Sequence, residues 1–240
     1  MSFYPCHSDP DCFVFYARIV ARRPGAVCLD KSYFYPGGGG QLPDRGVLRW
    51  VDGEAAVTHI EQADGRLWHC VDADIPGDDI IGVIDERFRS MMCQLHTDLH
   101  VLNALVYQHF DGALVTGVQM SADGTARIDF DLPGADNQKL REIEPELNGV
   151  ILASLPVHAL YVPAAEAARE AGLIRSRSVA PPRQENDTVR IIEIEGLDRQ
   201  ACGGTHLSRT SQSMPVRILK IENKGQRNRR IRIGLVDEAA

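Results

Sequence analysis

The chain has 240 residues, 44% hydrophobic and 25% charged, with a formal net charge of −7, and it can bury one large core or two modest ones. No apolar run approaches the ~20 residues that span a membrane, and the N-terminal MSFYPCHSDPDC lacks the features of a signal peptide. The six cysteines are scattered and make a poor disulfide framework, which suits a reducing compartment, so a cytoplasmic location is expected.

The first part of the chain, residues 1–85, contains short apolar or alternating stretches separated by Pro-Gly, Gly-rich and Asp-Gly turn signals. Several short strands with little helical periodicity favour a small antiparallel β-barrel. The expected strands are Phe13–Val20, Ala26–Leu29, Gly46–Trp50, Ala55–Ile60 and Leu67–Val71.

The pattern changes near residue 85. From Glu86 to about Phe110, apolar residues recur every three or four positions, which predicts an amphipathic helix. Mixed strands and helices follow without strict alternation, so residues 86–240 are expected to form an α+β domain behind the barrel domain of residues 1–85. The remaining expected elements are a hairpin of Ala113–Ser121 and Thr125–Asp131, a helix Asp136–Ser154, a strand Val157–Val162, a helix Ala164–Ala171, a loop over residues 175–188, a strand Val189–Glu195, and a pair of strands Val216–Ile221 and Arg230–Val236.

Two separate residue pairs predict a metal site. His96 and His100 are four residues apart on the long helix and therefore share one face. Cys202 and His206 flank two glycines, which favours a turn that brings thiolate and imidazole together. Three imidazoles and one thiolate suit Zn²⁺.

Each pair alone is more often an ordinary set of polar residues than a site. Their combination favours a metal, and the distance between them along the chain excludes a zinc finger, whose pairs lie within ~12–20 residues. An HExxH peptidase is also excluded, because Thr97 rather than glutamate follows His96.

HTDLHVLNAL and ACGGTH resemble the paired metal motifs of the editing domain of alanyl-tRNA synthetases and of the free-standing AlaX editing proteins. Further segments match in the same order. They are the glycine-rich Tyr35–Gln41 with Asp44 and Gly46, Gln119–Ser121, Arg127–Phe130, and Lys224-Gly225 with Arg229–Ile231. The glycine-rich segment is similar to that of the longer AlaX forms, which carry an N-terminal barrel. The match covers about residues 30 to 235, with Asp98 and Val101 as small departures from the family pattern.

The resemblance implies a small barrel followed by an editing domain of the threonyl/alanyl-tRNA synthetase type. It also implies zinc-dependent hydrolysis of the ester in alanine tRNA mischarged with serine or glycine. The chain would act in trans, since nothing in it resembles aminoacylation or anticodon-reading regions. A hydrophobic synthetic site cannot strongly reject an analogue that merely adds a hydroxyl, so a second, hydrolytic site has a clear purpose.

The residues expected to act follow from these patterns. Cys202 is expected to be essential as a ligand, Gln119 is a candidate to position water or substrate, and Thr97 a candidate to contact the aminoacyl group. The glycine-rich segment suggests a turn with positive φ beside the pocket, with Gly38, Gly39, Gly40, Gln41 and Asp44 as candidate substrate-binding residues. Four protein ligands usually close a zinc site, so either one ligand is loose or the metal only orients the substrate.

Charge is unevenly distributed. Residues 1–85 hold 7 basic and 13 acidic residues, whereas residues 216–232 hold seven basic residues and one acidic. A phosphate backbone responds to such local patches, and the candidate tRNA-binding residues are Lys220, Lys224, Arg227, Arg229 and Arg230. Two alternatives remain open: a nucleic-acid-binding protein whose zinc is purely structural, and a zinc hydrolase of small esters or amides.

Overall fold

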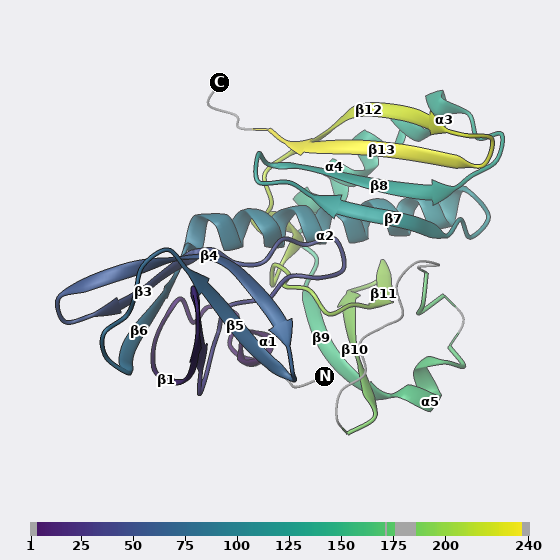
Figure 1. Cartoon of the computed structure of the whole chain (residues 1–240). Helices are drawn as coiled ribbons and strands as arrows, with labels where there is room; N and C mark the ends of the chain where they lie inside the picture. The colour runs from purple at the N-terminus through teal and green to yellow at the C-terminus, as the bar shows by residue number, and fades with distance from the viewer. Residues whose placement is uncertain (1–3, 171, 176–185, 237–240) are drawn as a thin grey trace. The chain divides into compact units, whose positions relative to one another are not determined.

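The computed structural model describes residues 4–170, 172–175 and 186–236 (Figure 1). It divides into two compact units. The first comprises the described residues up to Gly38 together with Leu42–Met91, and the second comprises Gly39–Gln41 together with the described residues from Met92 onward. The short segment Gly39–Gln41 therefore belongs to the second unit although the first surrounds it in sequence. A domain boundary after residue 85 stays a prediction.

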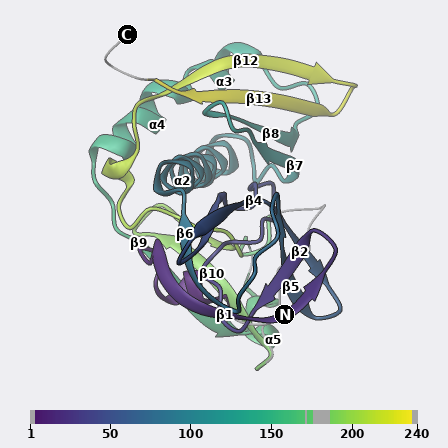
Figure 2. The same ribbon diagram turned by 60° about the vertical axis from the view of Figure 1, so that its left-hand side comes forward.

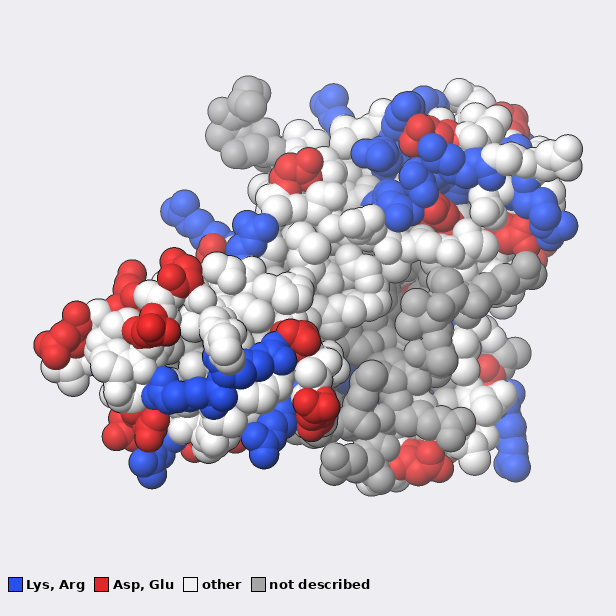
Figure 3. All heavy atoms as spheres, in the orientation of Figure 1, with Lys and Arg blue, Asp and Glu red and all other residues white. Residues whose placement is uncertain are grey.

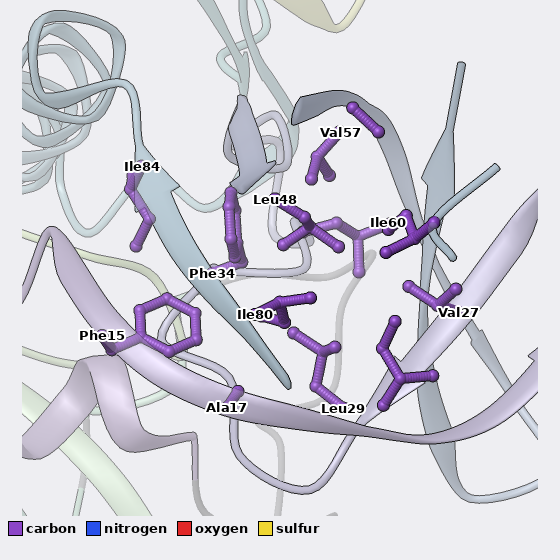
Figure 4. Packing of buried hydrophobic residues seen from close by; sticks show 13 residues of the cluster. Phe15, Ala17, Val27, Leu29, Phe34, Leu48, Val57, Ile60, Ile80 and Ile84 are labelled. Atoms are coloured by element: carbon purple, nitrogen blue, oxygen red, sulfur yellow. The ribbon is translucent and has the colours of Figure 1, made fainter. Parts of the chain in front are cut away.

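The first unit is a closed antiparallel barrel, which confirms the predicted barrel. Its strands follow one another around the barrel in the order β1-β2-β5-β4-β3-β6. Their bounds are β1 (Val14–Arg23), β2 (Ala26–Leu29), β3 (Gly46–Trp50), β4 (Gly53–Ala63), β5 (Arg66–Val71) and β6 (Asp79–Ile84), and a short helix α1 (Pro5–Ser8) precedes them. Alternate residues of β1, such as Phe15 and Ala17, point inward and pack with Phe34 and Leu48 in the barrel core (Figure 4).

Strand β6 was not among the strands expected from the sequence. Gly82 interrupts the apolar run of this strand, and because glycine is unfavourable in strands, the sequence does not indicate a strand here. The structure explains this glycine, because a Cβ at Gly82 would lie 2.4 Å from the Phe15 ring. The barrel thus accepts a weak strand former so that an aromatic side chain can fill its interior.

The second unit has two antiparallel sheets and several helices, in agreement with the predicted α+β class. One sheet has the order β12-β13-β8-β7 and the other β11-β10-β9. The long helix α2 (Glu86–His109), most of which belongs to this unit, passes between the two sheets (Figures 1 and 2). The strands are β7 (Val115–Met120), β8 (Thr125–Asp131), β9 (Val157–Pro163), β10 (Thr188–Ile194), β11 (Asp198–Ala201), β12 (Val216–Lys224) and β13 (Asn228–Leu235).

One expected helix is in fact two. The stretch Asp136–Ser154 contains α3 (Asn137–Arg141), capped by the Asp136 side chain, and α4 (Ile143–Leu152). Pro145 is the reason, because proline inside one continuous helix would remove a hydrogen bond and clash with the preceding turn. Restarting the helix at Ile143 places the proline in a first turn, where it is tolerated.

Two other elements differ from what the sequence predicts. The helix expected over Ala164–Ala171, of which residue 171 lies outside the described residues, is the single turn α5 (Ala164–Ala167). Strand β11 was not expected. A short 3₁₀ turn spans Thr210–Gln212. Of the loop expected over residues 175–188, residues 176–185 lie outside the described residues. In the part of the chain described, no helix is long and apolar enough to cross a membrane.

Candidate metal centre

Helix α2 supplies two of the four predicted ligands. His96 and His100 lie one turn apart, and both are buried, with their ring centroids separated by 5.4 Å. The intervening Thr97 and Asp98 are also buried, at 0% and 1% exposure. A run of polar side chains inside a protein requires partners, because burying an unsatisfied polar group is costly. The buried polar residues of this stretch of α2 therefore indicate a functional site rather than part of the hydrophobic core.

The other two ligands come from the turn after β11. The Arg190 guanidinium of β10 donates hydrogen bonds to the carbonyls of Cys202 and Gly204, at 3.0 and 2.8 Å. The Gly204 amide in turn donates to the Cys202 sulfur at 3.4 Å. A Cβ at Gly204 would lie 2.0 Å from Cε1 of His96, so only glycine allows this turn to approach the helix. The hydrogen bonds from Arg190 and the absence of a side chain at Gly204 thus allow Cys202 and His206 to lie beside the histidines of α2.

The four predicted ligands converge. One ligand atom from each of His96, His100, Cys202 and His206 lies within 4.8 Å of the others, so the group could hold a metal ion. The Cys202 sulfur is 3.3 Å from Nε2 of both His96 and His206. Zn–S and Zn–N bonds of about 2.3 and 2.0–2.1 Å give S···N edges of roughly 3.6 Å in a tetrahedron, so these two distances need to lengthen by only about 0.3 Å.

The charges at Cys202 and His206 favour metal binding, whereas the charge at His100 opposes it. Burial opposes ionisation of Cys202, but the neighbouring His96 and His206 hold the pKa of its thiol well below the usual value. Burial and the proximity of His96 hold the pKa of His206 well below its usual value as well, so this imidazole stays neutral. For His100 burial is outweighed by the hydrogen bond with Asp198, and its pKa rises to about 9. A metal that binds here therefore displaces a proton from His100.

Each histidine is held by a polar partner at its other ring nitrogen. Nδ1 of His100 lies 3.3 Å from the carboxylate of Asp198, and Nδ1 of His206 lies 3.3 Å from the Thr97 hydroxyl. Nδ1 of His96 lies 2.8 Å from Oε1 of Gln41. Such contacts orient metal-binding imidazoles and are common in metal sites. Thr97, predicted as an aminoacyl contact, is thus turned toward a ligand, and its hydroxyl also accepts the Leu207 amide at 3.1 Å.

The glycine-rich segment adopts the predicted positive-φ turn. Gly38, Gly39 and Gly40 have φ of 125°, 60° and 86°. The carbonyl of Gly40 accepts the Met120 amide at 2.8 Å, and a Cβ at Gly40 would lie 2.6 Å from the Val118 carbonyl. The segment therefore lies directly against the backbone of β7, where a side chain has no room.

Asp44, another predicted substrate-binding residue, is buried within the first unit. Its carboxylate accepts the Tyr35 amide at 2.6 Å and forms an ion pair with the buried Arg89, whose Nε lies 2.8 Å from Oδ1. Arg89 also donates to the Tyr33 carbonyl at 2.9 Å. These bonds tie the start of α2 to the chain around the glycine-rich segment.

Gln119, the predicted water-positioning residue, does not contact the metal ligands among the described residues. Its side chain is exposed on the outward face of the four-stranded sheet and accepts a hydrogen bond from Arg127 at 3.2 Å. The next residue, Met120, points into the core. Among the described residues, the contacts of Gln119 do not include a metal ligand. Its predicted part in positioning water stays a prediction.

The basic residues of β12 and β13 gather on the same outward face (Figure 3). Arg230 pairs with Asp129, Arg227 with Asp131, and both Lys220 and Lys224 lie near Glu222. Arg229 differs, because it alternates to the inner face and is only 7% exposed.

Three residues that contact a ligand or the turn that carries two ligands are not predicted by any sequence motif: Asp198, Arg190 and Thr205. Asp198 and Gln200 lie on the inner side of β11, two residues apart and just before Cys202, and both are buried. Gln200 donates to Asp198 at 2.6 Å and accepts from Asn103 of α2 at 2.6 Å. The signal was present as alternating polar residues that lead up to a ligand, which is the pattern of a strand with a polar inner face.

Comparison with known proteins agrees with this arrangement. Residues 189–232 match the family model described as the threonyl and alanyl tRNA synthetase second additional domain, and residues 11–88 match that of class II (A) tRNA synthetases. The chain is 39% identical over 222 residues to the alanyl-tRNA editing protein AlaX-M of Methanosarcina barkeri, covering 88% of this chain and 89% of that protein. It is 35% identical to AlaX-M of Saccharolobus solfataricus, covering 90% of this chain and 92% of that protein.

The alanine–tRNA ligase of Methanopyrus kandleri is also similar, with 35% identity over 218 residues, or 89% of this chain but only 23% of the ligase. Barrel, α+β unit and His/Cys group together thus define a protein of the class II synthetase editing type, and the match covers only part of the ligase. Within that class, the chain belongs to the family of AlaX-M alanyl-tRNA editing proteins.

Proposed function

We propose that this protein is a zinc-dependent hydrolase acting in trans on alanine tRNA mischarged with serine or glycine, cleaving the ester between amino acid and terminal adenosine. The observation that carries the proposal is the convergence of His96, His100, Cys202 and His206 in a chain of the AlaX-M family. The imidazole and thiolate donors, together with the low pKa of the Cys202 thiol, suit Zn²⁺. By the Irving–Williams order alone, the site would bind Cu²⁺ more tightly than Zn²⁺. The soft Cys202 thiolate is therefore part of the argument for Zn²⁺.

When bound, Zn²⁺ supplies positive charge that polarises an acyl carbonyl or lowers the pKa of water. The protein's own contribution is to hold the site rigid and to exclude bulk water from it. His96 and His100 are buried, and the turn that carries Cys202 is fixed by Arg190. Because aminoacyl esters are already reactive, holding the ester in one orientation accounts for a large part of the acceleration.

The glycine-rich turn is the part of the site that we assign to the aminoacyl group. Gly39 is exposed with nothing within 4 Å of an added Cβ, whereas Gly40 is packed against β7 and its carbonyl already accepts the Met120 amide. The exposed backbone at Gly39 can hydrogen-bond a small polar side chain such as that of serine. An alanine methyl gains nothing from the same groups, so this contact favours serine over alanine, whereas discrimination of glycine from alanine would depend on other contacts.

The outward face of the β12–β13 hairpin is the proposed tRNA surface (Figure 3). Lys220, Lys224, Arg227 and Arg230 lie there with partial or full exposure. Their ion pairs with Glu222, Asp131 and Asp129 are exposed or partly exposed pairs, which contribute little and can be exchanged for phosphate contacts. The buried Arg229 is expected to support the sheet rather than to contact RNA.

Deacylation of alanine tRNA charged with serine, glycine or alanine, with and without a zinc chelator, tests the proposal. We expect chelator-sensitive release of serine or glycine that spares alanine. Cys202→Ala should remove both the metal and the activity, whereas Cys70→Ala in the barrel strand β5 should change neither.

Tight tRNA binding without turnover would overturn the proposal in favour of a structural metal. Salt-independent cleavage of small esters would overturn it in favour of a general esterase, because phosphate contacts make tRNA binding salt-sensitive.

A further inference from the structure

Gln41 contacts the metal centre from a distant part of the sequence. It is 3% exposed and belongs, with Gly39 and Gly40, to the second unit. Its amide makes three short contacts: Nε2 donates to the Thr205 hydroxyl at 2.7 Å, and Oε1 accepts the Thr205 amide at 3.0 Å and faces Nδ1 of His96 at 2.8 Å. Every polar atom of this side chain is therefore engaged with a ligand or with the turn that carries two ligands.

These contacts determine which atom of Gln41 faces the histidine. A backbone N–H can only donate, so the Gln41 atom that faces the Thr205 amide must be the oxygen. The same oxygen lies beside Nδ1 of His96, and an oxygen of this kind only accepts. His96 must then carry its proton on Nδ1, which leaves the lone pair of Nε2 directed toward the Cys202 sulfur, 3.3 Å away.

We propose that Gln41 is a positioning residue of the metal centre, which fixes the tautomer and ring orientation of His96 and thereby sets the affinity for the metal. The resemblance assigned this residue to substrate binding, and the geometry assigns its amide to His96 instead. The glycine-rich segment then has two tasks, because the exposed Gly39 is the proposed contact for the aminoacyl group while Gln41, two residues later, holds a metal ligand.

Gly204 shows how tightly this arrangement is built. A Cβ at Gly204 would lie 2.3 Å from Nδ1 of His96 and 2.8 Å from Oε1 of Gln41. The glycine therefore borders the hydrogen bond itself and leaves room for it. The hydrogen bond is enclosed, so water cannot replace Gln41 as acceptor without moving the turn.

The inference rests on the metal-binding part of the proposed function, and its test measures metal binding directly rather than deacylation. Affinity for Zn²⁺ is measured by competition with a chromophoric chelator, and the ligand field by the absorption of the Co²⁺-loaded protein. Gln41→Met keeps length and volume but removes the acceptor, and we expect a 10–100-fold loss of affinity with a changed Co²⁺ spectrum. Gln41→Glu keeps an acceptor oxygen, and affinity should stay within about threefold of wild type or increase.

Two further variants separate positioning of His96 from simple support of the turn. Thr205→Val removes the hydroxyl that Gln41 binds but leaves the contact with His96, and it should change affinity by less than about threefold. Gln108→Met, an exposed glutamine near the end of α2, is the matched control for the substitution and should match wild type.

A loss in Thr205→Val or Gln41→Glu as large as that in Gln41→Met would overturn the proposal, and so would wild-type affinity in Gln41→Met. Should Gln41→Met fail to fold, the comparison of Gln41→Glu with Thr205→Val still decides, since the proposal requires both to bind well. If the wild-type protein bound neither Zn²⁺ nor Co²⁺, the proposed function itself would be wrong, which is a distinct result.

Discussion

Replacing Gly204 by alanine is the smallest change that should disable the metal centre. The new Cβ would lie 2.0 Å from Cε1 of His96, whereas ordinary van der Waals contact begins at 3.4 Å. One of the two groups must therefore move by about 1.4 Å, the difference between these distances. Because protein–metal bonds tolerate only about 0.2 Å, His96 or the turn that carries Cys202 can no longer reach its place.

We expect Gly204→Ala to lower the affinity for Zn²⁺ at least 100-fold, which corresponds to about 2.7 kcal/mol, and to abolish deacylation. Competition with a chelator measures the affinity, and circular dichroism of the metal-free protein confirms that the variant is folded. Gly149→Ala is the matched control, because that glycine lies on an exposed part of α4 with nothing within 4 Å of an added Cβ. It should bind metal normally and be more stable by up to about 1 kcal/mol.

Wild-type affinity in a folded Gly204→Ala protein would refute this reasoning. It would mean that the turn can relax away from α2 without disturbing the ligands, so that close packing against His96 does not fix their positions.

Three other predictions concern stability and RNA binding. Burial lowers the pKa of His69 from 6.5 to about 4. Between pH 6.5 and pH 4, His69 is therefore protonated in the unfolded chain and neutral in the folded barrel. Stability contributed by neutral His69 is therefore present above about pH 6.5 and lost as the pH falls toward 4. Urea unfolding of the metal-free protein should show a decrease of about 2 kcal/mol between pH 7 and pH 5 that is absent in His69→Gln. An equal decrease in that variant would locate the effect in other groups. Asp44→Ala should cost ~3–5 kcal/mol in urea unfolding because it leaves the buried Arg89 without its counter-ion, and a loss below 1 kcal/mol would mean that the pair is dispensable. Lys220→Ala and Lys224→Ala should each weaken tRNA binding and reduce the slope of log affinity against log salt by roughly 1, and unchanged slopes would place the RNA on another surface.

The elements that the sequence predicts well are those whose periodicity is strong. Strands β3 and β8 and the long helix α2 follow their hydrophobic patterns almost to the residue. Strands β6 and β11 are not predicted. Gly82 weakens the apolar pattern of β6, and the inner face of β11 is polar. The inner residues of β11, Asp198 and Gln200, serve the metal centre rather than the core, so a search for apolar alternation passes over them.

The ligands of the candidate site could be predicted, but their supporting contacts could not. His96 and His100 are recognisable from helical spacing, whereas nothing in the spacing of Gln41 connects it with either of them. Contacts between residues far apart in sequence depend on how the chain folds back on itself. The close approach of Gly204 to His96 likewise follows from tertiary packing. The double glycine predicted a turn at this point, but the φ of Gly204 is not positive, so glycine is required at position 204 because a Cβ has no room.

The placement of Gly39–Gln41 with the second compact unit has a consequence for dissecting the protein. A fragment that starts at Glu86 would retain all four metal ligands and still leave Nδ1 of His96 and the Thr205 amide without the acceptor that Gln41 provides. The two ligand motifs transplanted into another scaffold would also lack the acceptor that Gln41 provides. The metal centre is therefore not modular along the sequence, and its shortest self-sufficient version must include a tripeptide borrowed from the middle of the barrel segment.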